Sequence, residues 1–193
     1  MEKTQLEQEH VLNVEAPKKQ LTKVQLFVLY FVLFSFVGWI LETLFCLYTL
    51  HYFTKRGFLY GPICPIYGWG ALLLIAFLGK YKENNAKLFF YSAVAFSAFE
   101  YVVSYVLEAL FAMHWWDYTG EFMNLNGRIS VFYFLAWGMI AILFINHLYP
   151  FVEKKLKWLL AKIPYKVQVV TVYVLLTSVV IDTIASSVRY LLR

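Results

Sequence analysis

Five long blocks of apolar residues alternate with short polar segments along the chain. Each block approaches the roughly 20 residues that an α-helix needs to cross a hydrocarbon core of about 30 Å. The pattern therefore predicts an all-α fold, a polytopic bundle of about five transmembrane helices. The predicted spans cover about residues 21–50, 63–79, 87–113, 129–149 and 165–192. The polar residues 1–20 are expected to form a cytoplasmic tail, and residues 21–193 the transmembrane bundle.

The composition strengthens the membrane prediction. Hydrophobic residues make up 61% of the 193 residues and charged residues 15%, against about 45–50% and about 25% in soluble domains. This composition excludes an intrinsically disordered chain, and the length of the apolar blocks argues against a soluble globule. One bundle of this size leaves no room for a separate soluble catalytic domain. The net charge is +5, but the bases lie between apolar blocks, which indicates a lipid bilayer and no nucleic acid as the partner.

The distribution of Lys and Arg predicts the orientation. Twelve of the 17 basic residues fall in the N-terminal segment and in the loops after the second and fourth spans, and five fall on the opposite side. Cytoplasmic loops of membrane proteins carry the excess of Lys and Arg. We therefore expect a multi-pass protein of the cell membrane with a cytoplasmic N-terminus and an extracytoplasmic C-terminus.

The segment 151–163 mixes lysines with Leu, Trp and Ile. This mixture predicts an amphipathic helix on the cytoplasmic leaflet, where anionic lipid contributes about 1 kcal/mol per basic residue. Docking to a cytoplasmic partner is the alternative interpretation.

The stretch 54–71, before the second predicted span, is rich in Gly and Pro. Pro removes backbone donors and Gly permits positive φ, so the stretch predicts irregular backbone. Such backbone is tolerated at membrane depth only where it is buried in protein or lines a wet cavity. We interpret it as a re-entrant or unwound start of the second span, and the alternative is a tight turn leading into a Gly-rich helix.

Four acidic residues fall within the apolar blocks, where a charged side chain at the bilayer centre costs about 2.5–3.5 kcal/mol. They are Glu42, Glu100, Glu108 and Asp182. Each lies on the stripe of small and polar residues of its helix, so we expect it to face other helices or a cavity. The predicted orientation places Glu100 nearer the middle of the bilayer and the other three in its outer half.

Three arginines can reach the same layer, namely Arg56 and Arg128 from the outer loops and Arg189 from the last span. We expect them to pair with the acids in a polar cluster that opens toward the outer face. Glu100 has no obvious basic partner at its depth, which makes it the best candidate for a group that takes up a proton. The alternative is that these ion pairs only hold the helices together, since breaking a buried ion pair costs about 3–5 kcal/mol.

The second outer loop, residues 114–130, carries Trp and Tyr side chains that suit the membrane–water interface. Asp117 and Arg128 are expected to pair across this loop, or the loop serves as an aromatic belt and helix cap. His114 and Asp117 could share a metal ion, but two ligands are too few, so no metal or cofactor site is predicted.

Several strings of residues resemble one family of membrane proteins. The strings are Gly38-Trp39 followed by Glu42, then RGFLYGPICPIYG, then Glu100 and Glu108, then WWDY and NLNGRIS, then Trp137-Gly138, and finally Asp182 with Ser186. Over about residues 24–190 the chain is similar to the family described as putative ABC-transporter type IV. The resemblance implies a permease-like membrane component.

Motifs for ATP, zinc-dependent and serine-dependent hydrolysis are missing, since the sequence holds no GxxxxGK[ST], HExxH or GxSxG string. Any ATP-driven activity therefore needs a separate ATPase, and five spans without a visible inverted repeat favour a subunit or a homo-oligomer. Cys46 and Cys64 could form a disulfide in an oxidising exterior. We interpret them instead as ordinary small apolar residues.

The leading functional hypothesis is a transport or permease-type protein with an outward-facing polar cavity. The substrate- or ion-binding residues expected there are Glu42, Arg56, Tyr67, Glu100, Glu108, Asp117, Arg128, Asp182 and Arg189. Arginines could hold an anionic headgroup or carboxylate, and the acids could bind a cation or relay protons. The alternatives are a membrane-embedded enzyme acting on a lipid or lipid-linked substrate at the outer leaflet, and a non-catalytic assembly or sensor subunit.

Overall fold

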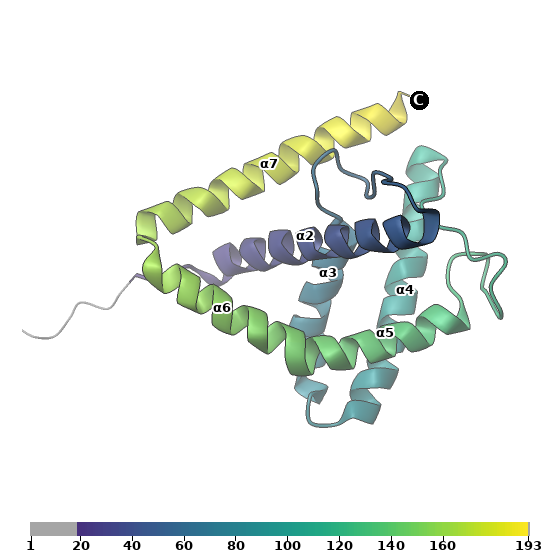
Figure 1. The fold of residues 1–193 in the computed structure, drawn as a ribbon, viewed down its shortest axis with the longest axis horizontal. Helices are drawn as coiled ribbons and strands as arrows, with labels where there is room; N and C mark the ends of the chain where they lie inside the picture. The colour runs from purple at the N-terminus through teal and green to yellow at the C-terminus, as the bar shows by residue number, and fades with distance from the viewer. Residues whose placement is uncertain (1–18, 193) are drawn as a thin grey trace, which may run out of the picture.

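The computed structural model describes residues 19–192, and these form helices joined by turns and two longer loops (Figure 1). Within residues 19–192 there is no strand, only an isolated bridge between Leu125 and Ile129. The helices are α2 (Lys23–Leu50), α3 (Pro65–Leu73), α4 (Asn85–Phe111), α5 (Val131–Leu143), α6 (Tyr149–Lys162) and α7 (Tyr165–Leu191). The all-helical prediction is confirmed for these residues, whereas most of the predicted cytoplasmic tail lies outside them.

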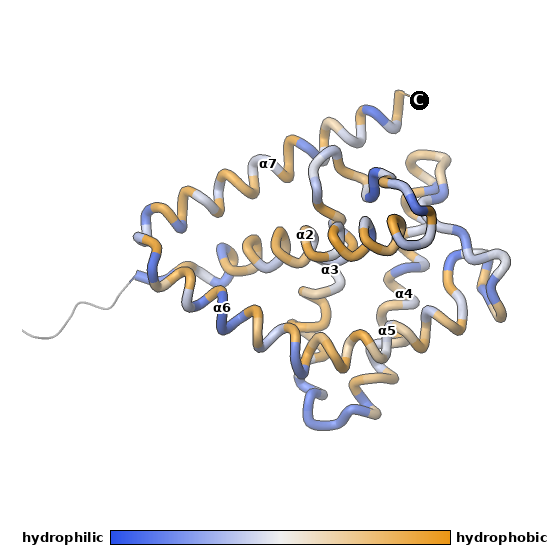
Figure 2. The backbone as a smooth tube through the Cα atoms, viewed as in Figure 1, coloured by the Kyte–Doolittle hydropathy of each residue, from blue (hydrophilic) through white to orange (hydrophobic). Residues whose placement is uncertain are grey.

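Four helices are long and apolar enough to cross a membrane (Figure 2). They are Lys23–Leu50, Asn85–Phe111, Val131–Lys162 and Tyr165–Leu191. The second predicted span corresponds to the shorter apolar helix Pro65–Tyr81, in which α3 continues through a π-helical turn and a short 3₁₀ turn. The chain is therefore an all-helical membrane protein, and the count of five spans stays a prediction.

Helix α5 continues into α6 without a break. A π-helical turn, Phe144–Leu148, joins them just before Pro150. Pro lacks a backbone donor and its ring clashes with the carbonyl four residues earlier, and a π turn at that place relieves both problems. The fourth predicted span was expected to end at residue 149, but the helix runs to Lys162. The predicted amphipathic helix 151–163 is thus the continuation of this helix, and its place on the lipid surface stays a prediction.

Glycines bring the helices into close contact. A side chain added at Gly38 of α2 would overlap the ring of Tyr67, and one at Gly68 of α3 would overlap the Ser35 hydroxyl. On the other side, Gly138 of α5 accommodates the ring of Phe89 from α4. Small residues let helix backbones approach closely in membranes, where no hydrophobic effect drives helices together. These contacts fix α3 against α2 and α5 against α4.

Residues 51–64, which we call the return segment, run back along α2 after it ends (Figure 1). The Cys64 amide donates to the Ser35 carbonyl at 2.9 Å. Ser35 lies about 22 Å before the end of α2 at Leu50, because an α-helix rises about 1.5 Å per residue. Helix α3 therefore begins beside the middle of α2. This geometry agrees with the re-entrant interpretation, while entry of the segment into the bilayer stays a prediction.

Candidate functional site

Glu42 and Glu108 lie within the last ten residues of α2 and α4, Glu100 lies further inside α4, and Asp182 lies on α7. Helices α2 and α4 both end in residues with left-handed backbone, His51 at φ 61° and Ala112 at φ 52°. A left-handed residue after a helix commonly ends it and turns the chain away. These endings direct both following loops back over this end of the helices, where their side chains meet the acids.

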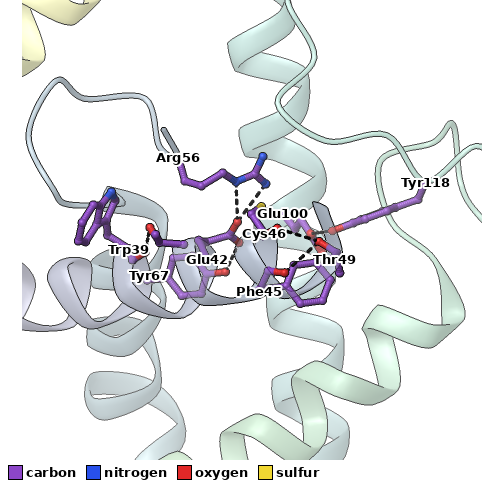
Figure 3. A network of polar contacts seen from close by, with 10 residues as sticks. Trp39, Glu42, Phe45, Cys46, Thr49, Arg56, Tyr67, Glu100 and Tyr118 are labelled. Carbon is purple, nitrogen blue, oxygen red and sulfur yellow. Dashed lines mark hydrogen bonds and ion pairs between the residues drawn. The ribbon is translucent and has the colours of Figure 1, made fainter. Parts of the chain in front are cut away.

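Glu42 joins α2 to the return segment and to α3 (Figure 3). Its Oε2 accepts from Arg56 Nη2 at 3.0 Å and from Arg56 Nε at 3.2 Å. Its Oε1 accepts from the Tyr67 hydroxyl at 2.5 Å. The expected pairing of Glu42 with Arg56 is formed, and Gly38 makes room for Tyr67 to reach the carboxylate. This group of three side chains is called the Glu42 cluster below.

Glu100 is the most buried of the four acids, with 5% of its surface exposed. Its Oε1 accepts from the Tyr118 hydroxyl at 2.9 Å and its Oε2 from Trp137 Nε1 at 2.8 Å. Among residues 19–192, no Lys, Arg or His lies within ion-pair distance of this carboxyl group. The expectation that Glu100 has no basic partner is therefore met for the described residues. Both groups that bind it are neutral.

Tyr118 and Trp137 were missed as site residues. Tyr118 reaches Glu100 from the second outer loop and stacks on Tyr133, with the ring centroids 4.2 Å apart. Burial, followed by the charge of Glu100, raises the pKa of the Tyr118 phenol above its usual range. The sequence could have identified Trp137, because it lies inside an apolar helix and a buried indole N–H needs a hydrogen-bond acceptor.

Glu108 pairs with Arg128 near the C-terminal end of α4, in keeping with the general expectation that arginines pair with the acids. Arg128 Nη2 donates to Glu108 Oε2, and Arg128 Nη1 donates to the Ser104 hydroxyl at 2.9 Å. His114 Nε2 lies 3.4 Å from Glu108 Oε1. A pocket of about 400 Å³ opens here, lined by Glu108, Arg128, Tyr105 and two alanines. The other predicted cavity residues, Glu42, Arg56, Glu100 and Asp182, do not line this pocket.

Asp182 is bound by backbone and not by an arginine, which corrects the expectation. Its carboxylate accepts from the amides of Tyr60 at 2.8 Å and Gly61 at 2.7 Å, and from the Ser186 hydroxyl at 3.0 Å. Arg189 instead donates to the Phe58 carbonyl at 2.9 Å. The return segment thus supplies partners to both residues. Backbone amides outside helices and strands still need hydrogen-bond acceptors, and a side-chain carboxylate can supply them. The residue pattern alone does not show which carboxylate an irregular segment will reach.

The expected pairing of Asp117 with Arg128 across the outer loop is also wrong. The Asp117 carboxylate accepts from the backbone amide of Thr119 at 2.9 Å and from the Thr119 hydroxyl. These hydrogen bonds hold the pKa of Asp117 below its usual range, and the one from the hydroxyl has the larger effect. A short loop side chain commonly binds the backbone two residues on. Arg128 instead forms an ion pair with Glu108.

The two cysteines are both buried, and neither is in a disulfide. In residues 19–192, no three His, Cys, Asp or Glu side chains group as a metal ion would require.

Four membrane-length helices, two of which are joined by the hydrogen bond from Trp137 to Glu100, define an integral membrane protein of the helical-bundle class. The family model described as putative ABC-transporter type IV matches residues 29–187, and the chain belongs to this family. It is therefore related to membrane transport proteins. No curated protein and no solved structure gives a significant match to the chain.

Proposed function

We propose that this chain is the membrane component of a transporter, in which Glu100 binds a proton or small cation during transport. The observation that carries this proposal is the burial of Glu100 with only two neutral donors, Tyr118 and Trp137, bound to it. A carboxylate inside a membrane is costly, and such groups commonly mark ion pathways and proton relays. The neutral form of Glu100 keeps one acceptor oxygen and gains a donor.

The Glu42 cluster and the Glu108–Arg128 pair are proposed as the charged groups that a substrate meets next to Glu100. In each pair a carboxylate is exposed in part, with 27% of the Glu42 side chain and 35% of the Glu108 side chain accessible. An anionic substrate group would compete with the carboxylate for the guanidinium, because guanidinium binds such groups with two parallel hydrogen bonds. Asp117 and Asp182 are proposed to hold the outer segments in place.

The proposed setting is the cell membrane, with the N-terminus in the cytoplasm and the C-terminus outside. The bias of Lys and Arg supports this orientation. Membership in an ABC-transporter family supports a partner ATPase, since these 193 residues hold no phosphate-binding loop. ATP hydrolysis would then come from a separate polypeptide, with α6 and its lysines at the cytoplasmic side.

Proton movement through reconstituted protein tests the proposal. The protein is placed in vesicles that enclose a pH-sensitive dye, and a potassium gradient with valinomycin drives protons inward. Vesicles with the wild-type chain are expected to acidify faster than protein-free vesicles, and Glu100→Gln is expected to remove the difference. Glu121→Gln is the matched control, because it removes an acid of the exposed outer loop and should leave the rate unchanged.

The Glu100→Asp variant separates chemistry from packing, because it keeps a carboxyl group that can bind a proton. It should retain part of the rate that Glu100→Gln loses. Equal rates for wild type and Glu100→Gln would overturn the proposal, and so would a wild-type rate no greater than that of protein-free vesicles.

A further inference from the structure

Arg189, near the C-terminal end of α7, differs from the other two arginines of the site. Arg56 and Arg128 each bind a carboxylate. Within residues 19–192, no carboxylate lies within ion-pair distance of Arg189, whose Nη2 donates to the Phe58 carbonyl. Its Nε is buried without a hydrogen-bond partner. Most donors of this guanidinium therefore have no acceptor in the described part of the chain.

The nearest acid on the same helix face does not neutralise Arg189. Asp182 lies two helical turns earlier, and its carboxylate is occupied by the amides of Tyr60 and Gly61 and by the Ser186 hydroxyl. The guanidinium carbon of Arg189 instead lies 4.0 Å from the centre of the Tyr60 ring. Aromatic faces orient the group and leave its charge in place. A partly buried charge without a counter-charge is costly, so the site favours an incoming anion.

An apolar pocket of about 380 Å³ is lined in part by Phe58, the residue whose carbonyl accepts from Arg189. Its walls come from α2, α3, α7 and the return segment, and they carry no charged side chain. The residues that matter for the argument are Phe31, Phe58, Trp69, Leu176 and Thr183. Phe58 connects the two features, because this residue lines the pocket and its carbonyl binds Arg189. An apolar cavity does not hold ordered water, and it binds apolar molecules.

A second cation lies on the same tyrosine. The Lys55 ammonium group is 4.7 Å from the centre of the Tyr60 ring, and no ion pair of Lys55 occurs within residues 19–192. Arg189 and Lys55 thus place two positive charges around Tyr60, which directly follows the pocket residues Phe58 and Leu59 in the chain. This combination matches a molecule with an anionic head and a hydrocarbon tail.

We propose that Arg189 and the pocket beside Phe58 form a binding site for an anionic phospholipid of the leaflet at the C-terminal end of α7. The phosphate binds the Arg189 guanidinium, with Lys55 close by, and one acyl chain fills the pocket between α2, α3 and α7. Free phosphate is not the ligand we infer, because it would leave the apolar pocket lined by Phe58 empty. The bound lipid would fasten the return segment to α7. This inference does not rest on the transport proposal, because it uses neither Glu100 nor the ion pairs of Glu42 and Glu108.

Mass spectrometry of intact protein–lipid complexes tests the site. Detergent-purified protein is mixed with dioleoyl phosphatidylglycerol, dioleoyl phosphatidylcholine or inorganic phosphate, each in a separate titration. Wild type is expected to retain one phosphatidylglycerol about tenfold more tightly than phosphatidylcholine, because the choline cation of phosphatidylcholine is repelled by Arg189 and Lys55, and a tenfold change needs about 1.4 kcal/mol. Inorganic phosphate should not be retained, because it has no chain to fill the pocket. Arg189→Gln should abolish the preference, and Arg189→Lys should keep part of it.

Thr183→Trp keeps Arg189 and fills the pocket, so it should lower phosphatidylglycerol binding as Arg189→Gln does. Lys82→Gln removes a lysine of the α3–α4 turn, is a matched charge control, and should bind as the wild type. Size-exclusion profiles show that each variant is folded. The proposal is overturned if Arg189→Gln and Thr183→Trp both retain the wild-type preference. Binding that Thr183→Trp leaves unchanged would also overturn it, because the anion would then bind without its chain.

Discussion

Tyr118 donates a hydrogen bond of 2.9 Å from an outer loop to Glu100, inside α4. The contact joins a segment outside the helices to the most buried acid of the chain. It also gives the loop a direct effect on that acid, because any movement that withdraws Tyr118 leaves Glu100 with Trp137 as its one donor among the described residues. The hydrogen bonding of Glu100 therefore depends on the conformation of the loop that carries Tyr118.

Removing the Tyr118 hydroxyl should weaken this contact and leave the rest of the loop intact. In Tyr118→Phe the ring still stacks on Tyr133, so the loss should be that of one hydrogen bond, about 1 kcal/mol. For a chain of this size that corresponds to a fall in Tm of about 2–4 °C in thermal unfolding of the detergent-purified protein. Tyr133→Phe is the control and should leave Tm unchanged. An unchanged Tm for Tyr118→Phe would show that this hydrogen bond does not stabilise the fold.

The close approach of α2 and α3 should make Gly38 intolerant of any side chain. An added Cβ would lie 2.2 Å from Tyr67 Cγ, so Gly38→Ala must displace the ring and weaken its bond to Glu42. Overpacking of this kind costs about 1–3 kcal/mol. Gly120→Ala is the matched control, since nothing lies within 4 Å of the added carbon. Thermal unfolding of both variants checks the prediction, which fails if their Tm values agree.

Asp182 should keep the return segment against α7. Asp182→Ala leaves the amides of Tyr60 and Gly61 without their acceptor, and the segment should open more often. Cys64 ends this segment and is 4% exposed, so its thiol reports the opening. In a Cys46→Ala background, Asp182→Ala should speed alkylation of Cys64 about tenfold, as a loss of about 1.4 kcal/mol would produce. Ser187→Ala, on the same helix, should leave the alkylation rate unchanged, and an equal rate in Asp182→Ala would contradict the prediction.

Labelling of single cysteines tests whether α4 crosses the membrane and which of its ends faces the cytoplasm. In a Cys46→Ala, Cys64→Ala background, Phe122→Cys in the second outer loop should react in intact cells with a maleimide that cannot cross membranes. Glu83→Cys, in the α3–α4 turn, should react only after the cells are opened. Both positions are exposed. Labelling of both in intact cells would show that α4 does not cross the membrane, and reversed labelling would show that the orientation is wrong.

The stability of the second outer loop should fall in acid. The pKa of Asp117 lies below its usual range because of the bonds from Thr119, so the contribution of these bonds is present above the unfolded-state pKa of Asp117. It is lost as the pH falls through the lower, folded-state pKa. Limited proteolysis of the loop should therefore accelerate below about pH 4. In Asp117→Asn this acceleration should be smaller, and an identical pH profile would exclude Asp117 as its source.

The sequence predicted the features that depend on single helices. The apolar blocks located the long helices, and the polar stripe of α4 identified Glu100 and Glu108. Charge and depth predicted that arginines pair with the acids, and the structure forms two such pairs, Glu42 with Arg56 and Glu108 with Arg128. The choice of partner was not predicted, since Arg128 was expected to pair with Asp117.

Other contacts could not be predicted, because they depend on where irregular backbone runs. Asp182 accepts from the amides of Tyr60 and Gly61, which in a regular helix would bond to backbone carbonyls. Arg189 therefore lacks the carboxylate partner expected for it and binds the Phe58 carbonyl. Trp137 of α5 donates a hydrogen bond to Glu100 of α4. Because Trp137 is uncharged, the pairing of opposite charges could not predict this contact. The π turn at Phe144–Leu148 depends on how the chain accommodates Pro150 within a continuous helix.

The bonds from Asp182 to the return segment have a mechanical consequence. Tyr60 and Gly61 are fastened to α7, and Arg56, a few residues earlier in the same segment, is fastened to Glu42 on α2. A shift of α7 relative to α2 would therefore stretch the few residues between Arg56 and Tyr60 and weaken the ion pair of Arg56 with Glu42.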